Sequence, residues 1–337
     1  MRQPDGGRVL LTQSRLRAYR ECPRLHHLKY IERWRAVRES EALRFGTLVH
    51  RGLEAWWRAW RRGEPALALG DALAAVAGRA GDAYEQAKVE EVLRGYDTAW
   101  AVDAVQYEVL GVEVPFEAPL LNPETWRSSA TWRLAGKVDL LLRRRLDGRV
   151  LVCEHKTTSE AMDDPAAAYW ARLQMDAQIS AYVIGAESLG HEVTDTLYDV
   201  ALRPGLRPLF ATPPENRKYR KDGGLYAGQR EADETPDEYR TRVRSSIEES
   251  PARYFQRRLI PRTESQIRDF LSDAWQQAAA MRLSERMGHA PRNPDACHRF
   301  GQCAYWEACS TGSSPAALPS LYGQIQDVNP ELQAQEV

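Results

Sequence analysis

Residues 139–158 read DLLLRRRLDGRVLVCEHKTT, and this stretch predicts a β-hairpin at the centre of the fold. Apolar runs flank Leu146-Asp147-Gly148, which supplies the turn chemistry. Glu154 and Lys156 are two residues apart, so they project from the same face of the second strand. Because the strands are antiparallel, Asp139 is expected near Glu154 at one end of the hairpin.

Two carboxylates and an amine at a strand end suit a hard divalent cation, because Mg²⁺ and Mn²⁺ prefer oxygen ligands. The lysine can orient or activate a water molecule and offset charge that develops on a phosphate. Taken alone, however, Glu-x-Lys is a short and common pattern. By its spacing alone it more often marks an ordinary strand end with a Glu–Lys salt bridge.

Other segments complete an α/β pattern around this hairpin. Alternating or apolar residues predict strands, and a 3.6-residue period or an Ala-rich composition predicts helices. The strands are expected at 107–120, 132–144, 148–157 and 194–202, and the helices near Thr12 or Ser14 and at 41–61, 66–104, 165–188, 236–248 and 263–285. We therefore expect a mixed sheet of four or five strands, flanked by helices.

The composition suggests a division of the chain into six parts. We expect a disordered start, an N-terminal helical region, an α/β core, a charged insertion, a helix with a cysteine-containing loop, and a mobile tail. Their bounds are 1–11, 12–106, 107–202, 203–262, 263–312 and 313–337.

The formal net charge is −1, with 46 Lys and Arg against 47 Asp and Glu, so the total charge does not indicate nucleic acid as a partner. The charge is unevenly distributed, however, and residues 15–38 and 217–230 are strongly basic. Either run could simply be a solvated face. No apolar leader or membrane span is visible, which favours the cytosol, where five cysteines indicate metal binding or catalysis rather than disulfides.

Four short segments occur in a fixed order: RFGTLVH (44–50), GKVDLL (136–141), CEHKTT (153–158) and QMDAQISAY (174–182). Together they resemble the RecB-like branch of the PD-(D/E)XK nuclease superfamily. The resemblance implies a PD-(D/E)XK restriction-endonuclease-like core in which His50, Asp139 and Glu154 bind metal.

The same resemblance implies that the backbone carbonyl of His155 is a further metal ligand and that Lys156 is the catalytic lysine. Gln178 and Tyr182 would form the Q-x3-Y pair near the site, and Gln174 could add a contact one turn earlier. By itself, His50 would fit a helix-surface histidine. An imidazole ligand suits Mn²⁺ better than Mg²⁺, so manganese is expected to support activity at least as well.

Three cysteines, Cys297, Cys303 and Cys309, are spaced C-x5-C-x5-C near the C-terminus. Three thiolates need a fourth ligand, and Cys22, within YRECPRLHHLKY (19–30), is the natural candidate. The layout of one early and three late cysteines is similar to that of CRISPR-associated iron–sulfur exonucleases and the AddB nuclease domain, which implies a 4Fe–4S cluster. Zinc also accepts four thiolates and remains an alternative, while Cys153 fits a buried apolar position.

DNA contacts are predicted in both basic stretches: Arg17, Arg20, Arg24, Lys29, Arg217, Lys218, Arg220 and Lys221. Tyr19, Tyr30 and Trp34 could stack on unpaired bases or belong to the core. No Walker motif, helix-turn-helix or zinc-finger reader is visible, so the chain is not expected to be a helicase or a reader of base sequence.

The resemblance favours a metal-dependent DNA exonuclease that acts on single-stranded ends in recombination, repair or phage DNA processing. Its partners would be DNA and a helicase, annealing protein or integrase, with no membrane. The alternatives are a DNA-binding subunit of a larger CRISPR-adaptation or helicase–nuclease complex with little activity alone, and a zinc-stapled protein without catalysis.

Overall fold

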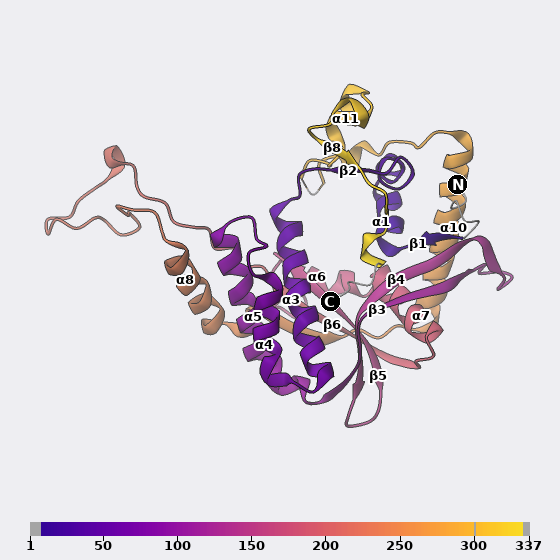
Figure 1. Cartoon of the computed structure of the whole chain (residues 1–337), viewed down its shortest axis with the longest axis horizontal. Coiled ribbons are helices and arrows are strands. Elements are labelled where there is room, and N and C mark those ends of the chain that lie inside the picture. Colours follow the sequence, from indigo (N-terminus) through magenta and orange to yellow (C-terminus); the bar gives the residue numbers. More distant parts are fainter. Residues whose placement is uncertain (1–7, 300, 333–337) are drawn as a thin grey trace.

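The computed structural model describes residues 8–299 and 301–332 and shows a sheet with helices on both sides (Figure 1). Within these residues six strands form one mixed sheet, in the order β1-β4-β5-β6-β7 with β3 also paired to β4. The β1–β4 and β5–β6 pairs are parallel, and the β3–β4, β4–β5 and β6–β7 pairs are antiparallel. The predicted α/β fold class is thereby confirmed.

The elements follow one another along the chain in this order: β1 (Val9–Leu11), α1 (Gln13–Glu21), α2 (Pro23–His26), η1 (His27–Ile31), β2 (Trp34–Ala36), α3 (Glu41–Arg62), η2 (Pro65–Leu67), α4 (Ala68–Val76), α5 (Ala83–Ala104), β3 (Tyr107–Leu121), β4 (Ser128–Arg144), β5 (Val150–Thr158), α6 (Ala168–Leu173), α7 (Ala177–Ser188), β6 (Val193–Leu202), η3 (Pro214–Asn216), α8 (Pro236–Glu249), α9 (Pro251–Tyr254), β7 (Phe255–Leu259), α10 (Glu264–Met287), η4 (Pro294–Ala296), α11 (Trp306–Thr311), η5 (Pro315–Ala317), β8 (Tyr322–Gln324) and η6 (Pro330–Leu332). Among the described residues, no helix is long and apolar enough to cross a membrane.

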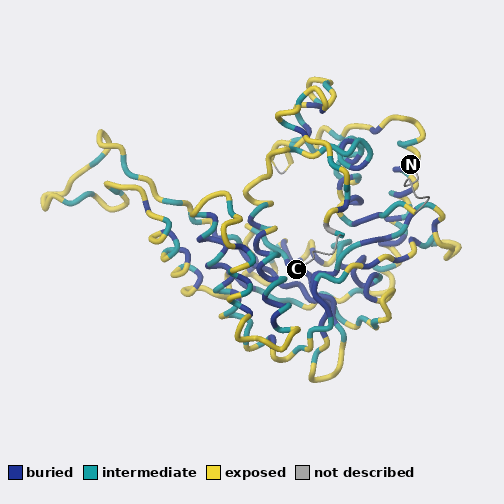
Figure 2. Tube along the Cα trace, in the orientation of Figure 1, coloured by how far each residue is buried: buried dark blue, intermediate teal, exposed yellow. Residues whose placement is uncertain are grey.

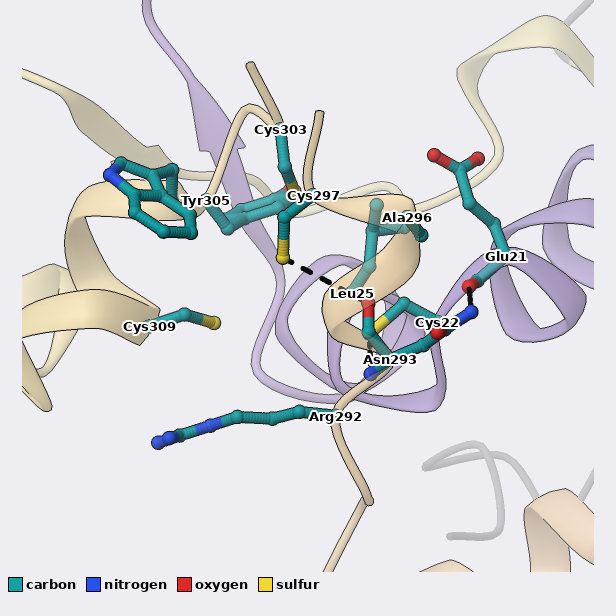
Figure 3. Close-up of a pocket in the computed structure, with 11 residues that line it drawn as sticks. Glu21, Cys22, Leu25, Arg292, Asn293, Ala296, Cys297, Cys303, Tyr305 and Cys309 are labelled. Carbon is teal, nitrogen blue, oxygen red and sulfur yellow. Dashed lines mark hydrogen bonds between the residues drawn. The ribbon is translucent and has the colours of Figure 1, made fainter. Parts of the chain in front are cut away.

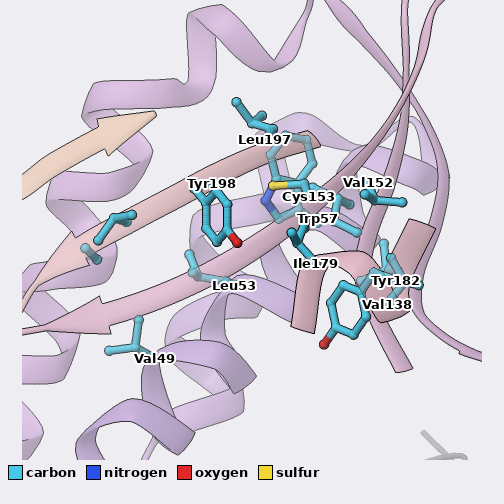
Figure 4. Packing of buried hydrophobic residues seen from close by; sticks show 14 of the residues in the cluster. Val49, Leu53, Trp57, Val138, Val152, Cys153, Ile179, Tyr182, Leu197 and Tyr198 are labelled. Carbon is cyan, nitrogen blue, oxygen red and sulfur yellow. The ribbon is translucent and has the colours of Figure 1, made fainter. Parts of the chain in front are cut away.

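Helices α3 and α7 supply apolar side chains to the sheet core (Figure 4). Val49, Leu53 and Trp57 come from α3, and Ile179 and Tyr182 come from α7. The apolar residues of α3 recur at intervals of three and four, so they form one buried stripe along the helix. Burial is concentrated in the sheet and on the helix faces that cover it (Figure 2).

A second, smaller core belongs to a lobe that stands apart from the sheet (Figure 1). We call residues 22–36 and 293–325 the cluster lobe, because they contain the four spaced cysteines. Leu28, Tyr305, Ala308 and Tyr322 form its core, and β2 pairs with β8 in an antiparallel two-stranded sheet. The lobe therefore joins a segment near the start of the chain to one near its end.

Two segments that we expected to lack regular structure contain strands. In the predicted disordered start, β1 pairs with β4, and Leu11 is buried, while residues 1–7 lie outside the described residues. In the predicted mobile tail, β8 pairs with β2, and Tyr322 is buried; residues 333–337 are not described. The expectation was wrong at both places because short apolar segments are stabilised by partners that lie far away in the sequence.

The other differences are interruptions and one additional strand. The helix predicted at 66–104 is divided into α4 and α5 by a turn in which Gly78 has a φ of 66°, a left-handed conformation that glycine adopts readily. The helix predicted at 165–188 is divided into α6 and α7. Strand β7 lies within the stretch interpreted as a charged insertion, and it extends the sheet beyond the expected four or five strands.

Residues 209–234 form an arm that projects away from the sheet and from the cluster lobe (Figure 1). The arm is mostly exposed (Figure 2), and its base is held where Glu234 and Leu209 exchange hydrogen bonds. Near its tip, Tyr219 and Leu225 form an isolated antiparallel bridge. The Arg217 guanidinium donates hydrogen bonds to backbone carbonyls of the arm itself.

The Phe116 ring fits between two glycines, and this contact holds α7 against the sheet. A Cβ atom at Gly185 in α7 would lie 2.5 Å from the ring, and one at Gly136 in β4 would lie 2.7 Å from it. We expect Gly185→Val to lower the free energy of unfolding by about 1–3 kcal/mol, because the ring and helix must separate. Urea unfolding measures this change. Gly205→Val is the control, since nothing lies within 4 Å of its Cβ position, and equal losses in the two variants would contradict the prediction.

Candidate active site

Strand β4 has different partners along one of its edges. Residues 132–134 pair with β1, and residues 140–143 pair with β5. In the described part of the chain, no strand pairs with residues 135–139 on that edge, while β3 continues along the other. The last β4–β5 pair is Leu140 and Cys153. Asp139 precedes Leu140 and Glu154 follows Cys153, so both acids lie where the two antiparallel strands separate.

Asp139 takes over a backbone hydrogen bond at this separation. Its Oδ2 atom accepts the backbone N–H of His155 at 3.0 Å, and its Oδ1 atom accepts the hydroxyl of Tyr182 at 3.2 Å. The Nδ1 atom of His50 lies 3.7 Å from Asp139 Oδ2. A buried N–H needs an acceptor, and here the carboxylate replaces the missing strand. Helices α3 and α7 thus both contact this carboxylate, α3 through His50 and α7 through Tyr182.

Lys156 lies among three oxygen-bearing side chains. Its Nζ atom is 2.7 Å from Glu154 Oε1, 2.9 Å from Gln178 Oε1 and 3.3 Å from Asp176 Oδ2. The second carboxylate oxygen of Glu154, Oε2, is buried and accepts no hydrogen bond within the described residues. The ammonium group is therefore fixed, and one oxygen of Glu154 has a lone pair available for a ligand.

The helical spacing of Gln178 and Tyr182 explains how they bridge the two strands. They are four residues apart on α7, so they lie on one face, and Gln178 Nε2 donates to Tyr182 Oη at 3.0 Å. One continuous path of hydrogen bonds thus joins Lys156, Gln178, Tyr182 and Asp139. Gln174 lies outside this path, at the end of α6.

Burial dominates the electrostatics of the two acids. Asp139 is 7% exposed and Glu154 is 2% exposed. Burial, followed by the charge of Glu113, raises the pKa of Asp139 to about 6. Burial, followed by the charge of Asp139, raises the pKa of Glu154 to about 8, although Lys156 opposes this shift. Because the two carboxyl groups are difficult to ionise at the same time, a nearby positive charge would stabilise their ionised forms.

The two basic groups at the site differ in charge. Burial and the neighbouring His155 lower the pKa of His50 to about 4, so its imidazole is neutral at pH 7 and retains a lone pair for a metal ion. Burial opposes the charged form of Lys156, but Glu154 and Asp176 raise its pKa above the ordinary value. Lys156 is therefore a cation at the site and not a general base in this arrangement.

Glu113 is a further acid beside the site that the sequence did not single out. It lies on β3 between the pairs Val112–Leu140 and Val114–Val138, which places it across from Asp139. Its φ is 53°, an uncommon conformation for glutamate, and its Oε2 atom is 2.5 Å from Lys137 Nζ. Glu113 therefore adds negative charge next to Asp139, balanced by Lys137.

The opposite face of β5 carries a different buried group. One ligand atom each from Cys153, His155 and Asp199 lies within 4.8 Å of the other two, so this group could bind a metal ion. Asp199 Oδ2, however, already accepts a hydrogen bond from Arg257 at 3.1 Å and another from the Tyr96 hydroxyl. The guanidinium balances the charge of Asp199, and this arrangement disfavours a second cation at the same carboxylate.

The four spaced cysteines line one cavity in the cluster lobe (Figure 3). Cys22 precedes α2, Cys297 follows η4, and Cys309 lies on α11. The backbone N–H of Asn293 donates to Cys22 Sγ at 3.4 Å, and the Asn293 side chain donates to the carbonyl of Glu21. All four thiols are free, and each cysteine is half-buried.

Two kinds of metal group accept four thiolates. Four thiolates around one zinc ion, at about 2.3 Å from the metal, stand about 3.8 Å from one another. Among the described residues, no three of the four sulfur atoms lie within 4.8 Å of one another. A 4Fe–4S cluster suits wider spacing, because each thiolate binds a different iron atom.

The predicted DNA-contact residues do not gather in one place. Arg17 and Arg20 lie on α1, Arg24 and Lys29 lie in the adjoining segment of the cluster lobe, and residues 217–221 lie on the arm. Figure 1 shows the arm directed away from the lobe, so the two basic stretches do not face each other across a groove. Tyr30 is 4% exposed and belongs to the interior, whereas Trp34 is half-buried.

Three neighbours of the site, Asp176, Asp199 and Arg257, were not predicted from the sequence. Of these, only Asp176 lies in a sequence pattern that could have identified it. Asp176 precedes α7, and its Oδ1 atom accepts the Gln178 backbone N–H at 2.9 Å, as an N-terminal helix cap does. An aspartate before an apolar helical run marks a helix start, which would have placed Asp176 next to Gln178. Nothing in the local pattern indicated Asp199 or Arg257, because their proximity depends on strand order.

Comparison with known proteins bears on this geometry. The PD-(D/E)XK nuclease superfamily model matches residues 10–310. Solved structures similar to this chain include a candidate exonuclease from Eubacterium rectale, with 11% identity, a TM-score of 0.41 and coverage of 89% of this chain and 87% of that chain. Another is the protein SSO0001, with 12% identity, a TM-score of 0.25 and coverage of 68% and 73%.

Comparison with curated protein sequences finds no match. The superfamily model, by contrast, spans the sheet, the helices around the strand separation and the four spaced cysteines. The chain belongs to the PD-(D/E)XK nuclease superfamily.

Proposed function

We propose that this protein is a metal-dependent DNA exonuclease that acts on single-stranded ends. The observation that carries the proposal is the strand separation at which Asp139, Glu154 and Lys156 meet His50. The buried Glu154 oxygen without a hydrogen-bond partner, among the described residues, supports a cation there, because an unpaired buried carboxylate is costly.

The residues at the separation have the donor chemistry of a divalent-cation site, although the ligand atoms of His50, Asp139 and Glu154 do not all lie within 4.8 Å of one another in the described structure. Asp139, Glu154 and the neutral His50 would hold it, and the backbone carbonyl of His155 would add a further oxygen. When bound, such a cation supplies an activated water and offsets charge on the phosphate. The imidazole in this ligand set favours Mn²⁺ over Mg²⁺.

The other side chains position these groups. Lys156 is held by three contacts, so its ammonium can orient a water molecule or stabilise negative charge on the phosphate. Gln178 fixes Lys156 and, through Tyr182, also fixes Asp139. Hydrolysis of a phosphodiester therefore depends on α7 as much as on the two strands.

Single-stranded DNA is supported by the charge of the cluster lobe and of α1. Arg17, Arg20, Arg24 and Lys29 lie on consecutive elements, and the half-buried Trp34 could stack on a base. We propose that this lobe guides the strand towards the site. The arm with Arg217, Lys218, Arg220 and Lys221 would contact DNA, or a helicase, annealing protein or integrase, away from the core.

We propose that the cluster lobe holds a 4Fe–4S cluster on Cys22, Cys297, Cys303 and Cys309. The four thiols line one cavity, which supports this choice. Free thiols in this arrangement suit a reducing compartment such as the cytosol.

The proposed activity predicts the behaviour of two variants. Asp139→Asn removes a metal-binding charge and Lys156→Ala removes the positioned ammonium, so each should lower the rate of DNA digestion at least about 100-fold. The assay uses 5′- and 3′-labelled single strands, a duplex and a single-stranded circle with Mn²⁺ or Mg²⁺, under anaerobic conditions.

The control for these variants is Asp163→Asn, which changes an exposed acid after β5 and should leave the rate unchanged. Digestion of the linear strands but not of the circle would support an exonuclease. Cutting of the circle would show endonuclease activity. If the wild-type protein with its cluster intact digests none of the substrates, the proposal of an independent nuclease fails.

Asp176 gives a second prediction. Asp176→Asn retains an oxygen to cap α7 but removes a negative charge 3.3 Å from Lys156 Nζ. We expect about a 10- to 100-fold fall in kcat, because Asp176 orients Lys156, with little change in thermal stability. Because Asp176 raises the pKa of Lys156, the alkaline limb of the pH–rate profile should move to lower pH.

The matched control for Asp176 is Glu160→Gln, which removes an exposed ion pair with Arg172 on α6. It should alter neither kcat nor the pH profile. An Asp176→Asn protein with the wild-type rate and the wild-type alkaline limb would contradict the role assigned to this carboxylate.

The cluster predicts a metal content. Protein purified without oxygen should be brown, absorb near 400 nm, and contain about four iron atoms and four sulfides per chain. Cys309→Ser should lose most of the iron, because one of four thiolates is removed, whereas Cys153→Ala in the sheet core should keep it. Elemental analysis that finds one zinc and no iron in the wild-type protein would overturn the assignment.

A further inference from the structure

A row of charged side chains crosses three neighbouring strands behind the candidate active site. His155 on β5 pairs in register with Asp199 on β6, and Asp199 pairs in register with Arg257 on β7. His155 Nδ1 lies 3.3 Å from Asp199 Oδ2, and Arg257 Nη2 donates to the same oxygen at 3.1 Å. Strand order therefore places a histidine, an acid and an arginine side by side.

The row is buried and enclosed by aromatic residues. The side chains of His155, Asp199 and Arg257 are 4%, 1% and 9% exposed. The Tyr96 hydroxyl donates to Asp199 and accepts from Arg257 at 2.9 Å, and Trp57 donates to that hydroxyl at 3.1 Å. Burial of an ion pair is costly unless the geometry is good and other hydrogen bonds are satisfied. The tyrosine supplies part of these bonds, while Asp199 Oδ1 and Arg257 Nε have no hydrogen-bond partner within the described residues.

The row meets the active site through one residue. The His155 side chain belongs to the row, while its backbone N–H donates to Asp139 Oδ2 at 3.0 Å. The His155 ring also lies edge-on to the ring of His50, with 6.2 Å between the ring centroids. A displacement of His155 would therefore reach Asp139 through the backbone N–H and His50 through the ring.

We propose that Asp199 and Arg257 are positioning residues of the nuclease site, which act by holding His155 and hence its peptide group. This inference rests on the proposed function, because it assigns the His155 peptide to the metal-binding end of β5. The backbone N–H of His155 orients Asp139, and the carbonyl of His155, which belongs to the next peptide group, is one of the proposed ligands. Beyond Cys153, β5 is no longer paired with β4. The contacts of His155 with Asp199, and of Asp199 with Arg257, would hold this part of β5 in place.

The test compares two buried carboxylate–arginine pairs in the full-length protein. Asp199→Asn removes the charge of the row. Glu91→Gln is the matched control, because Glu91 is 1% exposed on its side chain and accepts from Arg244 at 2.8 and 3.0 Å, between α5 and α8. The affinity for Mn²⁺ is measured without DNA, by the electron paramagnetic resonance of free Mn²⁺, alongside thermal unfolding and digestion rate.

We expect both variants to unfold at lower temperature, since each removes a buried carboxylate charge that faces an arginine, which is buried at Arg257 and about half exposed at Arg244. Only Asp199→Asn should weaken Mn²⁺ binding, by about 10- to 100-fold, with a parallel fall in kcat. Equal Mn²⁺ affinities in Asp199→Asn, Glu91→Gln and the wild type would overturn the inference while leaving the nuclease proposal intact. If the wild type neither binds Mn²⁺ nor digests DNA, the proposed function itself fails.

Two further variants keep the test decisive. If Asp199→Asn does not fold, Tyr96→Phe removes one hydrogen bond to Asp199 without changing a charge, and it should weaken Mn²⁺ binding about 2- to 5-fold. His155→Phe removes the Nδ1 atom that faces Asp199. Adding Asp199→Asn to His155→Phe should then change Mn²⁺ affinity less than 2-fold, because coupled residues are not additive. Additive effects would show that Asp199 does not act through His155.

Discussion

The hydrogen bond from the His155 backbone to Asp139 is the contact on which the active-site architecture depends. Two antiparallel strands separate at this point, and a buried N–H would otherwise lack an acceptor. Because a side chain accepts it, the strands can diverge without an unpaired amide. The space between them then becomes accessible to His50 from one helix layer and to Tyr182 from the other.

The divergence also explains the unusual density of charge inside the core. Buried acids at Asp139, Glu154 and Asp199 are each next to a basic group or a hydroxyl, which comes from another element for Asp139 and Asp199 and from the same strand for Glu154. The chain therefore places its charges in two layers. Glu154, which faces α7, is paired with Lys156, and Asp199, which faces α5, is paired with Arg257. Each carboxylate keeps one buried oxygen without a hydrogen-bond partner within the described residues.

The cluster lobe connects two segments that are far apart in the sequence. Its own apolar core is small, with Leu28, Tyr305, Ala308 and Tyr322 as its buried members. A lobe of this size gains much from a metal group that ties its two segments together. The strands β2 and β8 make the same connection by backbone hydrogen bonds, so the lobe is closed on two sides.

The sequence by itself determined the elements with strong local signals, which are helix α3 with its apolar stripe and the hairpin of β4 and β5. Local periodicity and turn chemistry act within a few residues, so one segment at a time is sufficient for such predictions. The site residues His50, Asp139, Glu154, Lys156, Gln178 and Tyr182 were predicted from the order of four motifs that resemble a known family. Only the tertiary structure decided the strand order, the additional strands β1, β7 and β8, and the row formed by His155, Asp199 and Arg257. These features depend on pairing between segments that are far apart in the sequence. The stability of such pairing depends on the partner strand, which the local sequence pattern does not identify.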